Sequence, residues 1–259
     1  MSTITITFAD GVENSKGMQI IGNRTDDGFS VADLKLAKEK FESAGYACEL
    51  ITFPPFEDQA AVLVVRNGCG ITHESKDSVA VFSELNALKW DKKAYSRGRV
   101  VNKIARFNLC FADAPQEADY ENKKGTVIPF EQVPPLDSLR RALPQYLGAK
   151  AEKLLAEGNN YYDTSKCYIG WHGDTERSIV VGARFGAQLP LNFQWFQRSA
   201  PLANSPVTSI LIQGGDLYAM SSKAVGNDWL SKIKPTLRHS AGNIEMKQLS
   251  LLGKRKPSI

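Results

Sequence analysis

The chain has 259 residues and a formal net charge of +4, and 42% of its residues are hydrophobic and 23% are charged. A chain of this length buries a full hydrophobic core, and this composition is that of an ordinary globular protein. No apolar run approaches the roughly 18 residues of a membrane-spanning helix. The pI near 8.8 is too weakly basic to indicate nucleic-acid binding by itself.

The N-terminus and the cysteines point to a reducing compartment. The first residues, MSTITITFADG, contain no basic segment followed by an apolar one, so we expect no secretory signal. The four cysteines form no Cys-x-x-Cys pair, and we expect free thiols. We therefore predict an intracellular protein, cytoplasmic or nuclear. The cysteines are Cys48, Cys69, Cys110 and Cys167.

The first 80 residues predict a ββαββ unit. Residues 3–8, TITITF, alternate β-branched residues and predict a strand, with residues 17–22 as its hairpin partner. Ser30 and Asp33 form a capping-box pattern that begins a helix, and Gly45 marks its end. Two further strands are expected at residues 48–53 and 61–68. We place a boundary near residue 80 and treat residues 1–80 as an extension of unknown role.

Residues 81–259 predict a second unit rich in short strands. A helix is expected over residues 83–90, and a helical block over 136–157 is expected to break into two helices at Pro144. Many short strands beside a helical layer indicate an α+β fold with a β-sandwich or jelly roll. The predicted strands are RFNLCFA, GTVIPF, SIVVGARFG, LNFQWF, VTSILIQ, DLYAMS and MKQLSLL.

The segment IGWHGDTE, residues 169–176, contains a candidate metal site. It places His172 and Asp174 two residues apart in a chain with only three histidines. Residues i and i+2 of a strand share one face, so both side chains project together. His239, in TLRHSAG, is the candidate third ligand. Two histidines and one carboxylate are the usual ligands of a non-haem Fe(II) oxygenase.

The neighbouring sequence resembles the AlkB-like family of Fe(II)/2-oxoglutarate dioxygenases. GGDLYAMSSKA, residues 214–224, is similar to the strand that precedes the family's second metal histidine. ARFNLCFAD, residues 105–113, is similar to its substrate-recognition lid, with Ala105 in place of a proline. The resemblance covers about residues 99–252. The residues that match the family's central motif are Asn160, Tyr162, Ile169, Gly170, His172, Asp174 and Glu176.

The resemblance implies a double-stranded β-helix that holds one Fe(II), with 2-oxoglutarate as co-substrate and O2 as oxidant. The metal ligands that it implies are His172, Asp174 and His239. Asn160 and Tyr162 are implied as contacts to 2-oxoglutarate, and an amide and a phenol both hydrogen-bond a carboxylate. On the substrate side, the expected contacts are Arg106, Trp171 and Glu176.

The last strand departs from the family pattern. The family has an arginine there that pairs with the distal carboxylate of 2-oxoglutarate, whereas this chain reads MKQLSLLGKRKPSI. Alignment puts Gln248 and Lys254 at the family's two arginine positions. Arg255 is favoured, because a guanidinium binds a carboxylate through two parallel hydrogen bonds, whereas an ammonium acts as a point charge. The competing cations are Lys247, Lys254 and Arg238.

Three functions remain open at this stage. The first is hydroxylation or demethylation of a modified base in DNA or RNA, single-stranded or flipped. The second is hydroxylation of a protein side chain or a small molecule, which the modest charge and the N-terminal unit favour. The third is a non-catalytic binding module. In the first case, four cations would contact the phosphate backbone of the nucleic acid. These cations are Arg97, Arg99, Lys103 and Arg106. The sequence does not predict the oligomeric state.

Overall fold

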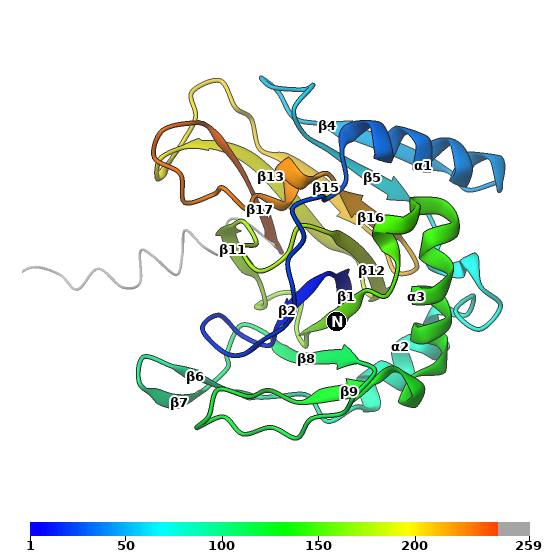
Figure 1. The fold of residues 1–259 in the computed structure, drawn as a ribbon, viewed down its shortest axis with the longest axis vertical. Helices are drawn as coiled ribbons and strands as arrows, with labels where there is room; N and C mark the ends of the chain where they lie inside the picture. Colours follow the sequence, from blue (N-terminus) through cyan, green and yellow to red (C-terminus); the bar gives the residue numbers. More distant parts are fainter. Residues whose placement is uncertain (243–259) are drawn as a thin grey trace, which may run out of the picture.

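Two β-sheets packed face to face form the centre of the molecule, and helices cover the outer face of the larger sheet (Figure 1). The structure is a computed structural model, and it describes residues 1–242. Strands dominate this part of the chain, which also contains four α-helices. The predicted α+β class with flanking helices is therefore confirmed.

The larger sheet has eight strands, which are antiparallel except for the parallel pair β8 and β9. Its central strand is β1, which pairs with β10 on one side and with β12 on the other. In sheet order, the strands are β4 (Cys48–Thr52), β5 (Ala61–Val65), β16 (Leu217–Met220), β12 (Val180–Gly186), β1 (Thr3–Ala9), β10 (Leu155–Tyr161), β8 (Phe107–Ala112) and β9 (Val127–Pro129).

The smaller sheet has five antiparallel strands, and it carries both candidate metal histidines. Two short ribbons, β2–β3 and β6–β7, stand apart from the sheets. The small-sheet strands are β11 (Ile169–His172), β17 (Thr236–Ala241), β13 (Leu189–Gln197), β14 (Ala200–Pro201) and β15 (Thr208–Ile212). The ribbon strands are β2 (Gly11–Glu13), β3 (Ile20–Gly22), β6 (Lys93–Ser96) and β7 (Arg99–Asn102).

Side chains cap the N-termini of two of the helices, α1 and α2. Ser30 and Asp33 form the predicted capping box of α1, and Asp77 caps α2 by accepting from two backbone amides. The ring of Phe41 in α1 stacks on the ring of Tyr146 in α3, with ring centroids 4.2 Å apart. The helices are α1 (Val31–Ser43), α2 (Ser78–Ala87), α3 (Pro134–Leu147) and α4 (Ser222–Val225). None of the helices in residues 1–242 is long and apolar enough to cross a membrane.

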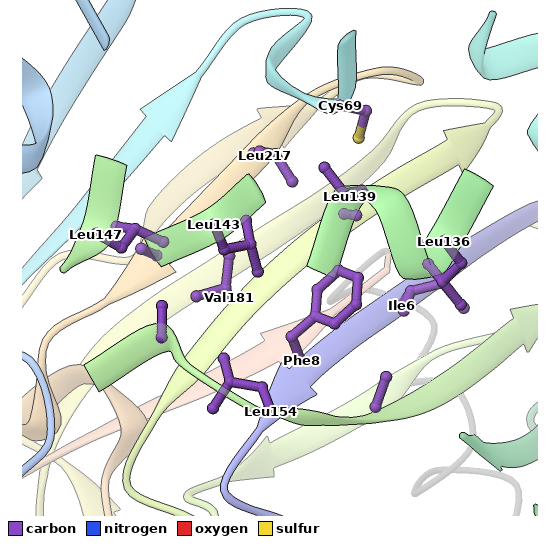
Figure 2. Packing of buried hydrophobic residues seen from close by; sticks show 14 of the residues in the cluster. Ile6, Phe8, Cys69, Leu136, Leu139, Leu143, Leu147, Leu154, Val181 and Leu217 are labelled. Atoms are coloured by element: carbon purple, nitrogen blue, oxygen red, sulfur yellow. The ribbon is translucent and has the colours of Figure 1, made fainter. Parts of the chain in front are cut away.

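The larger hydrophobic core lies between the helices and the large sheet. One apolar stripe of α3 packs onto the sheet, as Figure 2 shows. This packing fixes the large sheet as a rigid platform, so its opposite face can carry polar side chains. The α3 residues in the core are Leu136, Leu139, Leu143, Tyr146 and Leu147, and their sheet partners in the figure include Ile6, Phe8, Val181 and Leu217.

A second core lies between the two sheets. Trp195 of β13 is fully buried there, and its indole N–H donates to the carbonyl of Phe53 at 2.9 Å. Phe193 lies beside Phe53, with ring centroids 4.6 Å apart. These aromatic residues fill the space between the sheets on one side. The space beside them holds the cavity described below.

Strand β1 shows how the sequence divides the two faces of the large sheet. Its isoleucines and Phe8 belong to the helix-side core, and Thr5 and Thr7 line the cavity. All seven residues of β1 are buried. The alternation TITITF therefore separates an apolar core from a polar cavity, and neither face meets open solvent.

Two predictions about the N-terminal segment do not match the structure. β3 pairs with β2 and not with β1, because β1 already has neighbours on both edges. The predicted boundary near residue 80 does not divide the chain into two separate sheets, since β4 and β5 join the same sheet as β10 and β12. Residues 1–80 therefore supply part of the wall of the main fold.

Two helix boundaries also differ from the prediction. α2 begins at Ser78 because Asp77 caps it. α3 runs through Pro144 as one helix and ends at Leu147, because the next residue, Gly148, has a φ of 79°. The end of the predicted helical block, from Leu155, is the start of strand β10. The four cysteines are free thiols, as predicted.

Candidate metal centre and its cavity

Three side chains converge on one point between neighbouring strands of the small sheet. His172 of β11 pairs directly with His239 of β17, and their ring centroids lie 4.3 Å apart. The Oδ1 atom of Asp174 lies 3.5 Å from Nε2 of His172 and 3.7 Å from Nε2 of His239. Donor atoms of the three residues all lie within 4.8 Å of one another. The structure thus brings the three predicted metal ligands together.

Backbone carbonyls orient both imidazole rings. Nδ1 of His172 lies 2.7 Å from the carbonyl oxygen of Gly170, and Nδ1 of His239 lies 3.3 Å from that of Ala224. A carbonyl only accepts hydrogen bonds, so each Nδ1 is the donor, and in the neutral ring the lone pair for a metal is on Nε2. Such outer partners fix the tautomer of metal-binding histidines. Both rings therefore present a ligand atom toward Asp174.

The protonation state of His172 suits a metal ligand. Burial holds the pKa of His172 well below its usual value, and the neighbouring His239 and the cations Arg106 and Arg177 lower it further. Only the neutral imidazole offers a lone pair. The site is therefore poised to bind a cation near neutral pH.

Gly173 lies between His172 of β11 and Asp174 of the following turn. Because it has no side chain, the chain can approach α4 closely here. A Cβ at this position would overlap the carbonyl oxygen of Gly226 and would lie 2.8 Å from Cβ of Trp229. The amide of Asp174 donates to the carbonyl of Val225 at 3.0 Å, so α4 also fixes the position of the aspartate.

Gly173→Ala is expected to weaken divalent-metal binding at least about tenfold, the size of effect typical of residues that orient metal ligands. The added methyl meets backbone on one side, which cannot rotate away, so the ligand turn must shift. Titration with Mn(II) measures the affinity. Gly70→Ala is the matched control, because its Cβ would make only an ordinary contact at 3.8 Å. Equal losses in both variants would contradict this account.

The metal donors open into a cavity of about 580 Å³ between the two sheets. This volume is within the range of pockets that bind small molecules and cofactors. The structure places the three predicted substrate contacts, Arg106, Trp171 and Glu176, in its lining. Trp171 is half-buried and lies 5.6 Å from Phe196, ring centroid to ring centroid.

A buried arginine that the sequence analysis missed neutralises the acidic side of the cavity. Arg177 contacts the carboxylates of Glu157 and Glu176, and its Nε lies 3.8 Å from Oδ2 of Asp174. Burial alone would lower the pKa of Arg177, but these carboxylates raise it well above its usual value. The positive charge therefore stays beside the candidate metal ligand. The signal in the sequence was the run Asp-Thr-Glu-Arg, residues 174–177, which begins two residues after His172.

The Asn-x-Tyr pair expected to contact 2-oxoglutarate lies outside the lining of the cavity. Asn160 is opposite Ile4, on the helix side of the sheet, and the hydroxyl of Tyr162 donates to the carbonyl of Ile104 at 2.6 Å. Neither residue lines the cavity, whereas Asn159 and Tyr161 do. The sequence NNYY contains the Asn-x-Tyr pattern twice, and strand pairing selects the earlier copy.

The cavity is also lined by a cation that was not among those predicted from the sequence to bind the distal carboxylate. Arg255, Lys254, Lys247 and Gln248 lie outside the described residues 1–242. Arg238 alternates with His239 along β17 and so faces away from the metal site; its guanidinium donates to the carbonyl of Trp229 at 3.1 Å. Arg184 of β12, which the sequence analysis did not single out, lines the cavity and is 1% exposed.

Two of the four predicted phosphate-contacting cations are engaged inside the protein. Lys103 donates to Oδ1 of Asn14 and of Asn108, at 2.7 and 2.9 Å, and burial lowers its pKa to about 8. Arg106 donates to Asn159 at 2.5 Å. Arg97 and Arg99, at the turn of the β6–β7 ribbon, remain exposed.

The loop between β2 and β3 closes one side of the cavity. Glu13 and Lys16 line it, and the Lys16 ammonium lies 5.0 Å from the ring centroid of Trp229, which comes from the other end of the chain. Burial raises the pKa of Glu13 to about 7, against the hydrogen bond that the Gly17 amide donates to it. The N-terminal segment thus contributes chemistry to the site as well as structure.

Glu13→Gln is expected to stabilise the protein more at pH 8 than at pH 5. The folded-state pKa of about 7 lies above the unfolded value of 4.5, so the stability linked to this proton is complete below pH 4.5 and is lost as the pH rises through 7. Glutamine mimics the protonated carboxyl at every pH. Thermal melts at both pH values measure the effect, and Glu39→Gln on exposed α1 is the control. The same change in melting temperature at both pH values would contradict the prediction.

Comparison with known proteins gives a viral relative. The chain is 44% identical over 248 residues, 93% of its length, to the uncharacterized protein R156 of Acanthamoeba polyphaga mimivirus, of which 95% is covered. No family model matches the chain. The chain therefore belongs to the same family as this mimivirus protein.

Proposed function

We propose that the protein is an Fe(II)- and 2-oxoglutarate-dependent dioxygenase whose two sheets form a double-stranded β-helix. The observation that carries the proposal is the convergence of two imidazole Nε2 atoms and one carboxylate at a cavity. This ligand set leaves coordination positions open for a co-substrate and oxygen. The resemblance of the HGD segment to the AlkB-like family supports the same class.

The donor atoms fit one metal ion. Ligands that share a first-row metal at about 2.1 Å lie about 3 to 3.5 Å apart, and the separations from Asp174 are 3.5 and 3.7 Å. When bound, Fe(II) supplies the redox and oxygen-binding chemistry that side chains lack. His172 and His239 would hold the ion through Nε2, and Asp174 through its carboxylate.

The protein's own residues would orient the reactants and exclude water. In the overall reaction, 2-oxoglutarate and O2 yield succinate and CO2 while one oxygen atom enters a C–H bond of the substrate. Arg177 keeps its charge and so places a cation 3.8 Å from the Asp174 side chain. The closed sides of the cavity remove competing water from the reacting groups.

For the substrate we propose a modified base in DNA or RNA. Trp171 precedes His172 in the sequence, and its half-buried indole, 5.6 Å from the ring of Phe196, offers a surface on which a flat base stacks. The β6–β7 ribbon projects on the same side of the molecule as β11 (Figure 1) and carries exposed cations for a phosphate backbone. These cations are Lys93, Arg97 and Arg99, and the exposed Lys92 directly precedes the ribbon.

A second candidate is hydroxylation of a protein side chain or a small molecule. The internal hydrogen bonds of Lys103 and Arg106 favour it, because they remove two cations from a nucleic-acid surface. The salt dependence of binding separates the two candidates. A steep loss of affinity with rising salt supports a phosphate backbone.

The direct test is succinate formation by the protein with Fe(II), 2-oxoglutarate and O2, with and without methylated oligonucleotides. Stimulation by a methylated oligonucleotide over its unmodified copy supports the nucleic-acid substrate. Turnover that no oligonucleotide stimulates moves the substrate to the second class. Absence of succinate under all conditions refutes the oxygenase and leaves the non-catalytic binding module.

Tyr161→Phe is expected to weaken 2-oxoglutarate binding about tenfold, because a phenol that donates to a carboxylate is lost. Tyr162→Phe is the matched control, since that hydroxyl bonds to the Ile104 carbonyl outside the cavity. Calorimetric titration of both Mn(II)-loaded variants measures the affinities. A larger loss in Tyr162→Phe would restore the original Asn160–Tyr162 assignment.

A further inference from the structure

One charged side chain in the cavity wall has donor atoms without an acceptor in the part of the chain that the structure describes, and its guanidinium carbon lies 5.9 Å from the ring centroid of Tyr161. Arg184 lies on β12, is 1% exposed, and lines the cavity. Within residues 1–242, its Nε and Nη1 atoms have no hydrogen-bond acceptor. A buried guanidinium is strongly unfavourable unless an anion and hydrogen bonds compensate it. The cavity itself is therefore where a compensating anion would lie.

The nearby carboxylates do not fill this role. Asp216 influences Arg184 electrostatically, but its oxygens already accept from the Arg66 guanidinium at 2.7 Å and from the Asn67 amide at 3.1 Å. Arg177, equally buried, shows the contrast, because it contacts Glu157 and Glu176 directly. Of these two buried cavity arginines, Arg184 is the one left open to a ligand.

A second unsatisfied donor lies next to it. Thr5 of β1 is the direct cross-strand partner of Arg184, and its hydroxyl is also buried without a partner in the described chain. Directly opposed residues on one face have Cβ atoms about 5 Å apart. Both side chains line the cavity. Guanidinium and hydroxyl together form a receptor for the two oxygens of one carboxylate.

The cavity connects this pair to the metal donors. Val180, Gly182 and Arg184 alternate along the cavity face of β12, and the ring of Tyr218 occupies the space that a side chain at Gly182 would fill. Tyr218 lines the cavity together with Arg184 and Asp174, so the two sites open into the same space. A ligand that reaches both needs a carboxylate at one end and a metal-binding group at the other.

We propose that Arg184 and Thr5 bind one carboxylate of a small dicarboxylate whose other end reaches the His172–Asp174–His239 site. The identity of that ligand as 2-oxoglutarate rests on the proposed function. The distal carboxylate is then held by the large sheet, from strand β12, and not by Arg255 in the C-terminal segment.

Calorimetry on the full-length, Mn(II)-loaded protein tests this assignment, with 2-oxoglutarate and pyruvate as probes. Arg184→Gln is expected to weaken 2-oxoglutarate binding at least about a hundredfold and Thr5→Val about tenfold, whereas Arg184→Lys retains part of the affinity. Pyruvate has no distal carboxylate, so its affinity should be the same in wild type and Arg184→Gln. Arg255→Gln and Arg238→Gln should bind both probes as wild type does.

Two results would overturn the carboxylate site: unchanged 2-oxoglutarate affinity in Arg184→Gln, or a larger loss in Arg255→Gln. Mn(II) stoichiometry in the same samples shows that each variant retains its metal site. Succinate binding to the metal-free protein separates this proposal from the oxygenase. Binding of succinate that depends on Arg184, in a protein without turnover, would refute the oxygenase and support the carboxylate site.

Discussion

Alanine at His172, Asp174 or His239 is expected to abolish turnover and to weaken divalent-metal binding about a hundredfold or more. The free energy of metal binding is shared among a few ligands, so the loss of one removes a large fraction of it. The fold should persist, because these side chains line the cavity and lie outside the four hydrophobic core clusters. Mn(II) titration, with thermal melting of the same samples, measures both effects.

His73→Ala is the control for these variants. His73 lies exposed in a turn away from the small sheet, and its loss should change neither metal affinity nor turnover. A chelator should remove activity from the wild type reversibly, and Fe(II) should restore it. Wild-type metal affinity in any one of the three alanine variants would remove that residue from the ligand set.

The sequence predicted where strands lie more reliably than it predicted which strands pair with each other. The alternation of residues 3–8 identifies β1 and its two faces, but it is equally compatible with an edge strand and a central one. The pairing of Thr3 with both Tyr161 and Gly186 places β1 at the centre. Such contacts join residues more than 150 positions apart, and local pattern carries no information about them.

The convergence of the candidate metal ligands was predictable because the spacing of two of them is local. His172 and Asp174 are two residues apart, and a short turn beside a strand directs both to one point. The neighbouring sequence NNYY fits the Asn-x-Tyr pattern in two registers, and the sequence alone does not show which register faces the cavity. Only the opposition of Asn159 and Thr5, both of which line the cavity, decides which register faces inward.

Arg184 was overlooked for a related reason. VVGARFG predicts a buried strand, and a single arginine within it indicates either an edge position or a polar cavity. The structure shows that Val181, Ala183 and Phe185 fill the helix-side core, which directs Arg184 to the opposite face. The pattern of β12 thus contained the signal, but the cavity that explains it is built from distant strands.

Arg184→Met is expected to stabilise the ligand-free protein by about 1–4 kcal/mol, because an apolar side chain of similar length replaces a buried charge without a partner. Urea unfolding measures this gain. Arg177→Met is the contrasting variant and should lose about 3–5 kcal/mol, since it leaves Glu157 and Glu176 without their cation.

The order of stability should reverse when ligand is added. With Mn(II) and 2-oxoglutarate at about 100 times the dissociation constant, wild type gains about 2.7 kcal/mol from binding, whereas Arg184→Met gains little. A structural role for Arg184 predicts the opposite result in the absence of ligand, namely a less stable variant. Stabilisation without ligand, combined with loss of the ligand-induced gain, is the result expected if the fold maintains this unpaired charge for a bound carboxylate.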